Sequence, residues 1–278
     1  MKRSPTTTLR LTLAAAGLAC AAVWTTPSLG AASQQNWWVY VHNDHAPEIR
    51  ELLAAGADPN VRYKNGQPAL MRAVVDGAWK VFDVLAADPR TDLEATNPAN
   101  ETALMYLAVA GQTERARQLI ARGAKVNRLG WTPLHYAASK GHVETAKLLL
   151  AHQAMVNAPS PDGTTPFMMA GFSGSREMVQ LLLDAGADVA TRDLKGKNAA
   201  DWAEEGKQRK LARELATLIA EAQARRDAQR GGQAPAARPA AAAPAAAPAA
   251  TPEPPPARAE PAQPSVSGVS GVRLDTYE

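Results

Sequence analysis

The chain has 278 residues, and its 21 prolines concentrate near the C-terminal end, so we do not expect the whole length to be globular. Its formal net charge of +3 comes entirely from Lys2, Arg3 and Arg10, because residues 1–32 contain no acidic side chain. The rest of the chain is formally neutral. This balance excludes a general polyanion binder, which needs clustered Lys and Arg, and we expect no nucleic-acid partner.

Residues 1–32 are typical of a secretory signal peptide. The three basic residues precede an apolar run from Leu11 to Val23, which is too short to span a bilayer comfortably. Small residues follow, and they predict cleavage after Ala32 or, as a close alternative, after Gly30. A basic, alanine-rich leader of this kind is typical of bacteria, so the expected destination is the periplasm.

Cys20 is the only cysteine in the chain and lies inside this leader. If the leader is removed, the mature chain has no disulfide and no thiol chemistry. The stretch Gly17-Leu18-Ala19-Cys20 also resembles a loose lipobox, although Gly17 stands where Leu is usual. The alternative is therefore a lipoprotein anchored through Cys20, and only in that case do we expect contact with a membrane.

A short motif recurs along residues 68–203. The best copy is Thr-Pro-Leu-His-Tyr-Ala, beginning at Thr132, and weaker copies begin at Pro68, Thr102, Thr165 and Asn198. The copies follow one another with a period of about 33 residues. A second landmark, a Leu-rich stretch ending in Gly-Ala, repeats in step and contains Gly56, Gly123 and Gly186. Two landmarks in phase indicate a repeated structural unit.

The residue types explain this unit physically. Thr caps the N-terminus of a helix, and Pro is tolerated at the first helical position because no backbone bond is lost there. The glycines follow a second helix and permit a left-handed backbone. A helix pair this small cannot bury its apolar face alone, so neighbouring pairs must stack.

Thr132 to Leu150 resembles the core of an ankyrin repeat, with its T-P-L-H motif, glycine turn and Leu-rich second helix. The resemblance implies an all-α solenoid of about six helix–turn–helix repeats with short β-turn fingers, occupying residues 33–226. The expected repeats are 34–61, 62–95, 96–127, 128–157, 158–190 and 191 to about 226, the first and last being caps. The finger before the fourth repeat must be short, because few residues separate Asn127 from Trp131.

Residues 227–278 are expected to be a disordered Ala/Pro-rich tail. The stretch from Gly231 to Pro264 is dominated by proline and alanine, which offer little apolar surface to bury. Val272, Leu274 and Tyr277 are among the apolar residues that punctuate the end of the chain. This end is interpreted as a frayed terminus or, alternatively, as a short recognition motif.

No catalytic or metal-binding motif stands out, and we expect neither enzymatic activity nor a cofactor. His135 and His142 occupy positions where ankyrin repeats use histidine structurally. His42 and His45 lie close together in the sequence, but no further ligand completes a metal site at a convincing spacing. The sequence contains no serine-nucleophile elbow and no phosphate-binding loop of the Walker type.

Binding is therefore expected on the surface of the solenoid. The resemblance implies a concave face, built from the β-turn fingers and first helices, that holds a protein partner. We expect Trp131 and Tyr136 to lie on this face in contact with the partner, while Met169 could equally pack between repeats. The full set of expected contact residues is Arg72, Glu101, Tyr106, Trp131, Tyr136, Met169 and Phe172.

The sequence thus predicts a monomeric, non-enzymatic adaptor or scaffold in the bacterial periplasm that binds an unidentified protein. Resemblance to exported bacterial ankyrin proteins suggests a link to envelope maintenance or protection from oxidative stress. Two alternatives stay open: a secreted effector that acts on a host protein, and an accessory subunit of an envelope enzyme.

Overall fold

The structure, a computed structural model, describes residues 36–231 of the chain. The predictions of a signal peptide, of lipidation at Cys20 and of a tail beyond residue 231 lie outside these residues.

Residues 36–231 fold into twelve α-helices and contain no strand, apart from one isolated antiparallel bridge between Arg62 and Pro68. The helices form six consecutive pairs. The first helices of the pairs are α2 (Trp37–His42), α4 (Ala69–Val75), α6 (Ala103–Val109), α8 (Pro133–Lys140), α10 (Pro166–Ser173) and α12 (Ala199–Glu205). The second helices are α3 (Ala46–Ala54), α5 (Trp79–Ala87), α7 (Thr113–Ala121), α9 (Val143–Ala151), α11 (Arg176–Asp184) and α13 (Arg209–Gly231).

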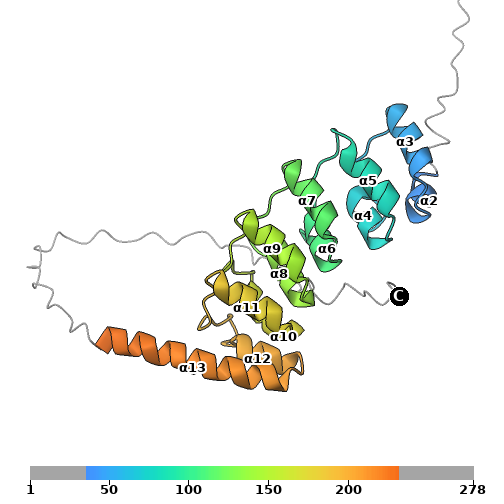
Figure 1. The fold of residues 1–278 in the computed structure, drawn as a ribbon. Helices are drawn as coiled ribbons and strands as arrows, with labels where there is room; N and C mark the ends of the chain where they lie inside the picture. Colours follow the sequence, from blue (N-terminus) through green and yellow to red (C-terminus); the bar gives the residue numbers. More distant parts are fainter. Residues whose placement is uncertain (1–35, 232–278) are drawn as a thin grey trace, which may run out of the picture.

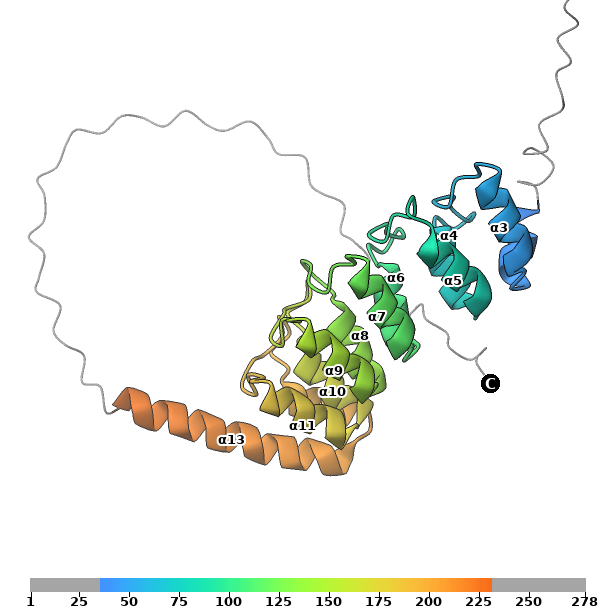
Figure 2. The ribbon, with the colours of Figure 1, turned by 45° about the horizontal axis from the view of Figure 1, so that its top comes forward.

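The pairs stack one after another along a single axis, and each pair contacts the next (Figure 1). The first helices form one layer, and the second helices α3, α5, α7, α9 and α11 form the other, as the turned view shows (Figure 2). We call the second layer the outer layer. The predicted solenoid of six helix pairs is confirmed.

The helix ends follow the expected local chemistry. Thr132 and Thr165 have extended backbones directly before Pro133 and Pro166, each of which begins a helix. Thr165 accepts a hydrogen bond from the backbone N–H of Met168 at 3.4 Å. At the other end of a pair, Gly123 adopts a φ of 98°, with no atom close enough to exclude a larger side chain, so the backbone conformation alone favours glycine there.

The core runs the length of the stack between the two layers. Leu134 and Leu149 of the fourth pair are fully buried, and Phe167 follows in the fifth pair. The first helices approach one another very closely at Gly171 of α10, where an added Cβ would lie 2.6 Å from the carbonyl oxygen of Ala199. Small side chains therefore set the spacing between consecutive pairs.

The end units are built differently from the middle ones. In the first unit Trp37 is 2% exposed and belongs to the core, and Trp38 packs edge-on against Tyr63 of the second unit. In the last unit α13 buries Leu211, Leu215 and Ile219. The domain boundary expected after residue 226 falls inside α13, which continues to Gly231.

Candidate protein interface

Five short loops, the fingers, connect consecutive pairs on the side of the first helices. Four of them, 63–67, 97–101, 160–164 and 193–197, are closed by a backbone hydrogen bond between their end residues, such as Ser160 N–H to Thr164 O at 2.9 Å. The remaining finger, 128–131, precedes the fourth pair and is shorter, and its Gly130 lies beside Pro161 of the next finger. The fingers and the first helices position every residue expected to contact a partner.

The structure divides these expected residues into two groups. Phe172 is 38% exposed, and Arg72, Tyr106 and Trp131 are partly exposed. Glu101, Tyr136 and Met169 are instead buried, at 4%, 5% and 2% exposure. The expectation that Glu101 and Tyr136 are exposed to a partner was wrong, and for Met169 the structure shows the packing alternative.

Glu101 and Tyr136 can be buried because the polar groups of their side chains are hydrogen-bonded to each other. The hydroxyl of Tyr136 donates to Glu101 Oε1 at 2.5 Å, and the hydroxyl of Tyr106 and the amide of Asn97 donate to Glu101 Oε2 at 3.0 Å and 2.7 Å. Burial, followed by the nearby charge of Glu101, raises the pKa of Tyr136 far above its ordinary value and that of Tyr106 to about 12. Both hydroxyls stay protonated, so this cluster ties the third pair to the fourth.

Met169 is buried for a different reason. Its helix, α10, lies between α8 and α12, and the close approach at Gly171 leaves no open surface beside it. Sequence reasoning weighed packing and binding equally for Met169, and the structure shows packing.

Trp131 lies at the edge of the buried cluster rather than free on the surface. Its ring packs edge-on against His135, with centroids 5.2 Å apart, and against Tyr136 at 6.2 Å. One part of the indole is thus fixed by the core, while the rest stays accessible.

Arg72 belongs to a separate cluster at the junction of the first two pairs. Its guanidinium donates to both carboxylate oxygens of Asp76 and lies 4.8 Å from the centroid of Tyr63. His42 Nδ1 bonds the same carboxylate at 2.5 Å, and its ring packs edge-on against Tyr63. Arg72 is therefore held in place by its neighbours rather than projecting freely.

Sequence reasoning missed two of the most exposed apolar side chains. Leu129 is 94% exposed at the tip of the short finger, and Leu194 is 80% exposed at the tip of the last finger. An apolar residue at the centre of a turn, where polar residues and glycine are usual, was the signal that could have identified both.

These two leucines stand on fingers that are linked through a third finger between them. The backbone N–H of Leu194 donates to Asp162 O at 2.9 Å, and exposed Pro161 sits beside Gly130. Leu129, Pro161 and Leu194 therefore form a series of exposed apolar side chains on three successive fingers, which we call the finger-tip row. Exposed apolar groups gathered in this way mark interaction surfaces.

The histidines serve the structure. His135 Nε2 lies 3.0 Å from the carbonyl oxygen of Thr164, and its Nδ1 accepts from the backbone N–H of Thr132 at 3.2 Å. Burial lowers the pKa of His135 to about 4, so the ring is neutral and donates through Nε2. His142 Nε2 lies 2.8 Å from the carbonyl oxygen of Val109. The expected structural roles of both residues are confirmed.

Within the described residues 36–231, no three His, Cys, Asp or Glu side chains are placed to share a metal ion, and no helix is long and apolar enough to span a bilayer.

The family model for ankyrin repeats (3 copies) matches residues 37–129, 80–160 and 125–193, which together cover more than half of the chain. The chain belongs to the ankyrin-repeat family. Repeats of this family form protein–protein interaction modules, and the stacked helix pairs with their fingers have that architecture.

Several curated proteins are similar over the same region. A probable E3 ubiquitin-protein ligase from rice, XBOS32, is 30% identical over 146 residues, or 52% of this chain and 29% of the rice protein. The E3 ubiquitin-protein ligase XBAT33 of Arabidopsis thaliana is 34% identical over 146 residues, or 52% of this chain and 28% of its own length. The inactive serine/threonine-protein kinase TEX14 of cattle is 34% identical over 111 residues, 40% of this chain and 5% of the kinase.

The chain therefore spans less than a third of the length of these relatives. The similarity supports the repeat architecture, and the names of the relatives describe those proteins only.

Proposed function

We propose that this protein is a non-enzymatic adaptor that binds a partner protein through its finger-tip row and the adjoining exposed side chains of the first helices. The proposal rests on the exposure of two leucines at finger tips: Leu129 is 94% exposed and Leu194 is 80% exposed. Exposing two large aliphatic side chains at rigid turn tips costs solubility, and a partner that covers them would gain their burial free energy, about 1.5–3 kcal/mol each.

Two further residues extend this surface onto the first helices. Phe172 of α10 is 38% exposed, with its ring packed edge-on against Trp202 of α12 at 6.2 Å. Trp202 in turn donates through Nε1 to Asp193 Oδ2 at 3.1 Å, which connects the aromatic pair to the last finger. Rigid aromatic groups beside exposed aliphatic ones are the usual anchors of protein interfaces.

A non-enzymatic role is supported by how the chain uses its reactive side chains. His135 and His142 are bonded to backbone carbonyls, and the tyrosine hydroxyls of the Glu101 cluster are protonated and engaged. The ligase activity named for the plant relatives is not part of the proposal, because the aligned region is less than a third of those proteins.

The sequence pattern of residues 1–32, which is typical of a signal peptide, supports export. We propose that the adaptor acts in the bacterial periplasm as a monomer, either free or anchored through Cys20. A contribution to envelope maintenance or oxidative-stress protection is the finer part of the proposal, and its support is the resemblance to exported bacterial ankyrin proteins.

The test is site-specific photo-crosslinking in intact bacterial cells that produce the full chain. A benzophenone amino acid is placed at position 129, at position 194 or, as the control, at position 117, because Arg117 is exposed on the outer layer. We expect the same partner to be crosslinked from 129 and 194 but not from 117.

Introducing Leu194→Asp into the chain with the probe at 129 should reduce that product at least tenfold, because a charge would enter the apolar contact. An equal yield from position 117, or an unchanged yield with Leu194→Asp, would show that the finger-tip row is not the interface.

A further inference from the structure

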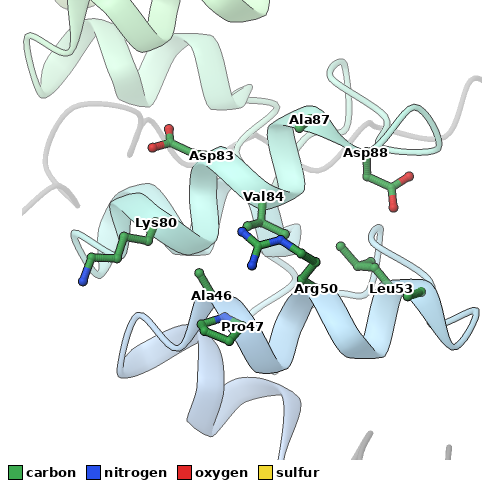
Figure 3. Close-up of a pocket in the computed structure, with 10 residues that line it drawn as sticks. Ala46, Pro47, Arg50, Leu53, Lys80, Asp83, Val84, Ala87 and Asp88 are labelled. Carbon is green, nitrogen blue, oxygen red and sulfur yellow. The ribbon is translucent and has the colours of Figure 1, made fainter.

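A groove of about 790 Å³ lies in the outer layer, on the side of the molecule away from the fingers, between α3 and α5. Its floor is formed by short or aliphatic side chains, and its rim is charged (Figure 3). The lining residues used below are Leu53, Val84, Arg50, Lys80, Asp83 and Asp88.

The other gaps in the outer layer are bridged by side chains. Arg115 reaches from α7 to Asp83 of α5 at 2.9 Å, and Thr113 and Thr145 join α7 to α9 at 2.8 Å. Lys147 and Glu177 face each other between α9 and α11 at 3.7 Å, and Arg176 pairs with Glu214 between α11 and α13. Among the described residues, no side chain of α3 pairs with a side chain of α5. Their junction is tied at its two ends, where Asp44 accepts from the backbone N–H of Val81 at 2.8 Å and Arg90 donates to Leu53 O at 3.1 Å.

The repeat register shows how this gap differs from the one between α9 and α11. Lys147 is the fifth residue of α9, and Glu177 is the second residue of α11. The equivalent residues in the first gap are Arg50, the fifth of α3, and Lys80, the second of α5. Opposite charges attract across one gap, whereas like charges face each other across the other.

The groove consequently carries uncompensated positive charge. Asp88 is already held by Arg90, whose guanidinium donates to it at 2.6 Å, and Asp83 is held by Arg115. Within residues 36–231 neither Arg50 nor Lys80 has an ion-pair partner, and both are exposed. In Figure 3 the guanidinium of Arg50 extends from α3 toward Val84 of α5. A ligand that fits must bring carboxylates to the rim and an aliphatic group to the floor beside Leu53 and Val84.

We propose that this groove binds residues 272–278 of the same chain, with Leu274 on the apolar floor and Asp275 and Glu278 facing Arg50 and Lys80. This segment combines an aliphatic residue with two carboxylates within five positions, and Asp275 directly follows Leu274. The segment lies outside the described residues.

The connecting chain is long enough for this contact. Forty residues, 232–271, separate Gly231 from the segment, and at about 3.1 Å per residue they can span roughly 120 Å. Five steps of about 8–10 Å between packed helices put the first pair roughly 50 Å from the last. The 23 residues of α13 add at most about 35 Å, so Gly231 lies within roughly 85 Å of the groove. Because the segment is covalently attached, its effective concentration at the groove is high even if its affinity as a free peptide is low.

Carbodiimide crosslinking of the full chain tests this contact directly, because the reagent joins a carboxylate to a lysine amine that it touches. The product sought is an amide between Lys80 and Asp275 or Glu278, identified by mass spectrometry in the fraction that migrates as a single chain. We expect it to exceed products between Lys80 and the more distant Glu253 and Glu260 by at least fivefold.

Two variants retain Lys80 and remove other parts of the proposed contact. Arg50→Glu and Leu274→Ser should each lower the yield of the Lys80 product at least fivefold. The matched control is Arg213→Glu, which makes the same charge reversal at an exposed site on α13 and should leave the yield unchanged. Circular dichroism confirms that each variant is folded.

Three results would overturn the proposal: absence of the Lys80 product, equal coupling of Lys80 to all four carboxylates, or products only between two chains. The crosslinking depends on no partner protein, so its failure would leave the proposed function of the finger-tip row untouched.

Discussion

The fourth and first repeats share one register but use different chemistry. Gly141, with a φ of 70°, corresponds to Asp44, with a φ of 54°, and His142 corresponds to His45. Counting back from these positions, buried His135 and Tyr136 of the fourth repeat correspond to Trp38 and Val39 of the first. Val39 is 52% exposed, whereas Tyr136 is 5% exposed.

The difference is one of position in the stack. The fourth repeat has a neighbour on each side, so its polar side chains reach buried carbonyl and carboxyl groups of those neighbours. The first repeat has a described neighbour on one side only, and it joins that neighbour with partly exposed groups such as His42 and Asp76. In the first repeat, where the motif is degenerate, partly exposed contacts therefore replace the buried hydrogen bonds of the fourth repeat. The outer layer has a groove at this end of the stack.

The largest expected effect comes from the same substitution made in both repeats. Leu149→Ala removes a fully buried side chain between two neighbours and should lower the free energy of unfolding by about 2–5 kcal/mol. Leu52, its register equivalent, is 7% exposed in the end repeat, and Leu52→Ala should cost about half as much. Urea unfolding followed by circular dichroism measures both; equal losses would contradict the contrast between inner and end repeats.

The next effect concerns the buried carboxylate of Glu101. Tyr136→Phe removes a donor from this group without changing the packing much, and we expect it to lower the free energy of unfolding by about 3 kcal/mol, since a charged acceptor is left underbonded.

Tyr106→Phe is the internal control, because its hydroxyl bond is longer and its side chain partly exposed; about 1 kcal/mol is expected there. Val39→Ala, at the equivalent of Tyr136, should change stability by less than about 0.5 kcal/mol. If all three variants unfold at the same urea concentration, the hydrogen bonds of the Glu101 cluster add no specific stability to the fold.

The smallest expected effect is a pH dependence that arises from His135 of the fourth repeat. Because burial lowers the pKa of His135 to about 4, the unfolded chain binds a proton there more readily than the folded chain does between about pH 6.5 and pH 4. The contribution of His135 to the free energy of unfolding is fully present above this pH range and decreases as the pH falls through it. Between pH 7.5 and pH 5 the loss should be about 2 kcal/mol.

The measurement compares urea unfolding of the unmodified chain and of His135→Gln at both pH values. On acidification the variant should retain the stability that the unmodified chain loses through protonation of His135. The first repeat carries Trp38 at this position, so Trp38→Phe should leave the pH dependence as it was. A His135→Gln variant as sensitive to acid as the parent would show that the proton is taken up elsewhere.

Much of the fold was predictable because each repeat is specified by residues that lie close together in the sequence. The motif beginning at Thr132 and the turn glycines such as Gly123 fix where helices start and end, and their period fixes how many pairs there are. The candidate site was less predictable. The variable position of the motif holds Tyr136 and Met169, and nothing in a single repeat shows whether its neighbours cover that position.

The sequence by itself determined the helix pairs, their number and their order along the stack, since each depends on capping residues, turns and periodic apolar positions within about 33 residues. Only the tertiary structure decided which side chains stay in water. Tyr136 is buried because Glu101, which is distant in the sequence, accepts its hydroxyl hydrogen, and Leu129 is exposed because its shortened finger presents it at the tip. The groove between α3 and α5 is likewise lined by Arg50 and Lys80, which come together only when the pairs stack.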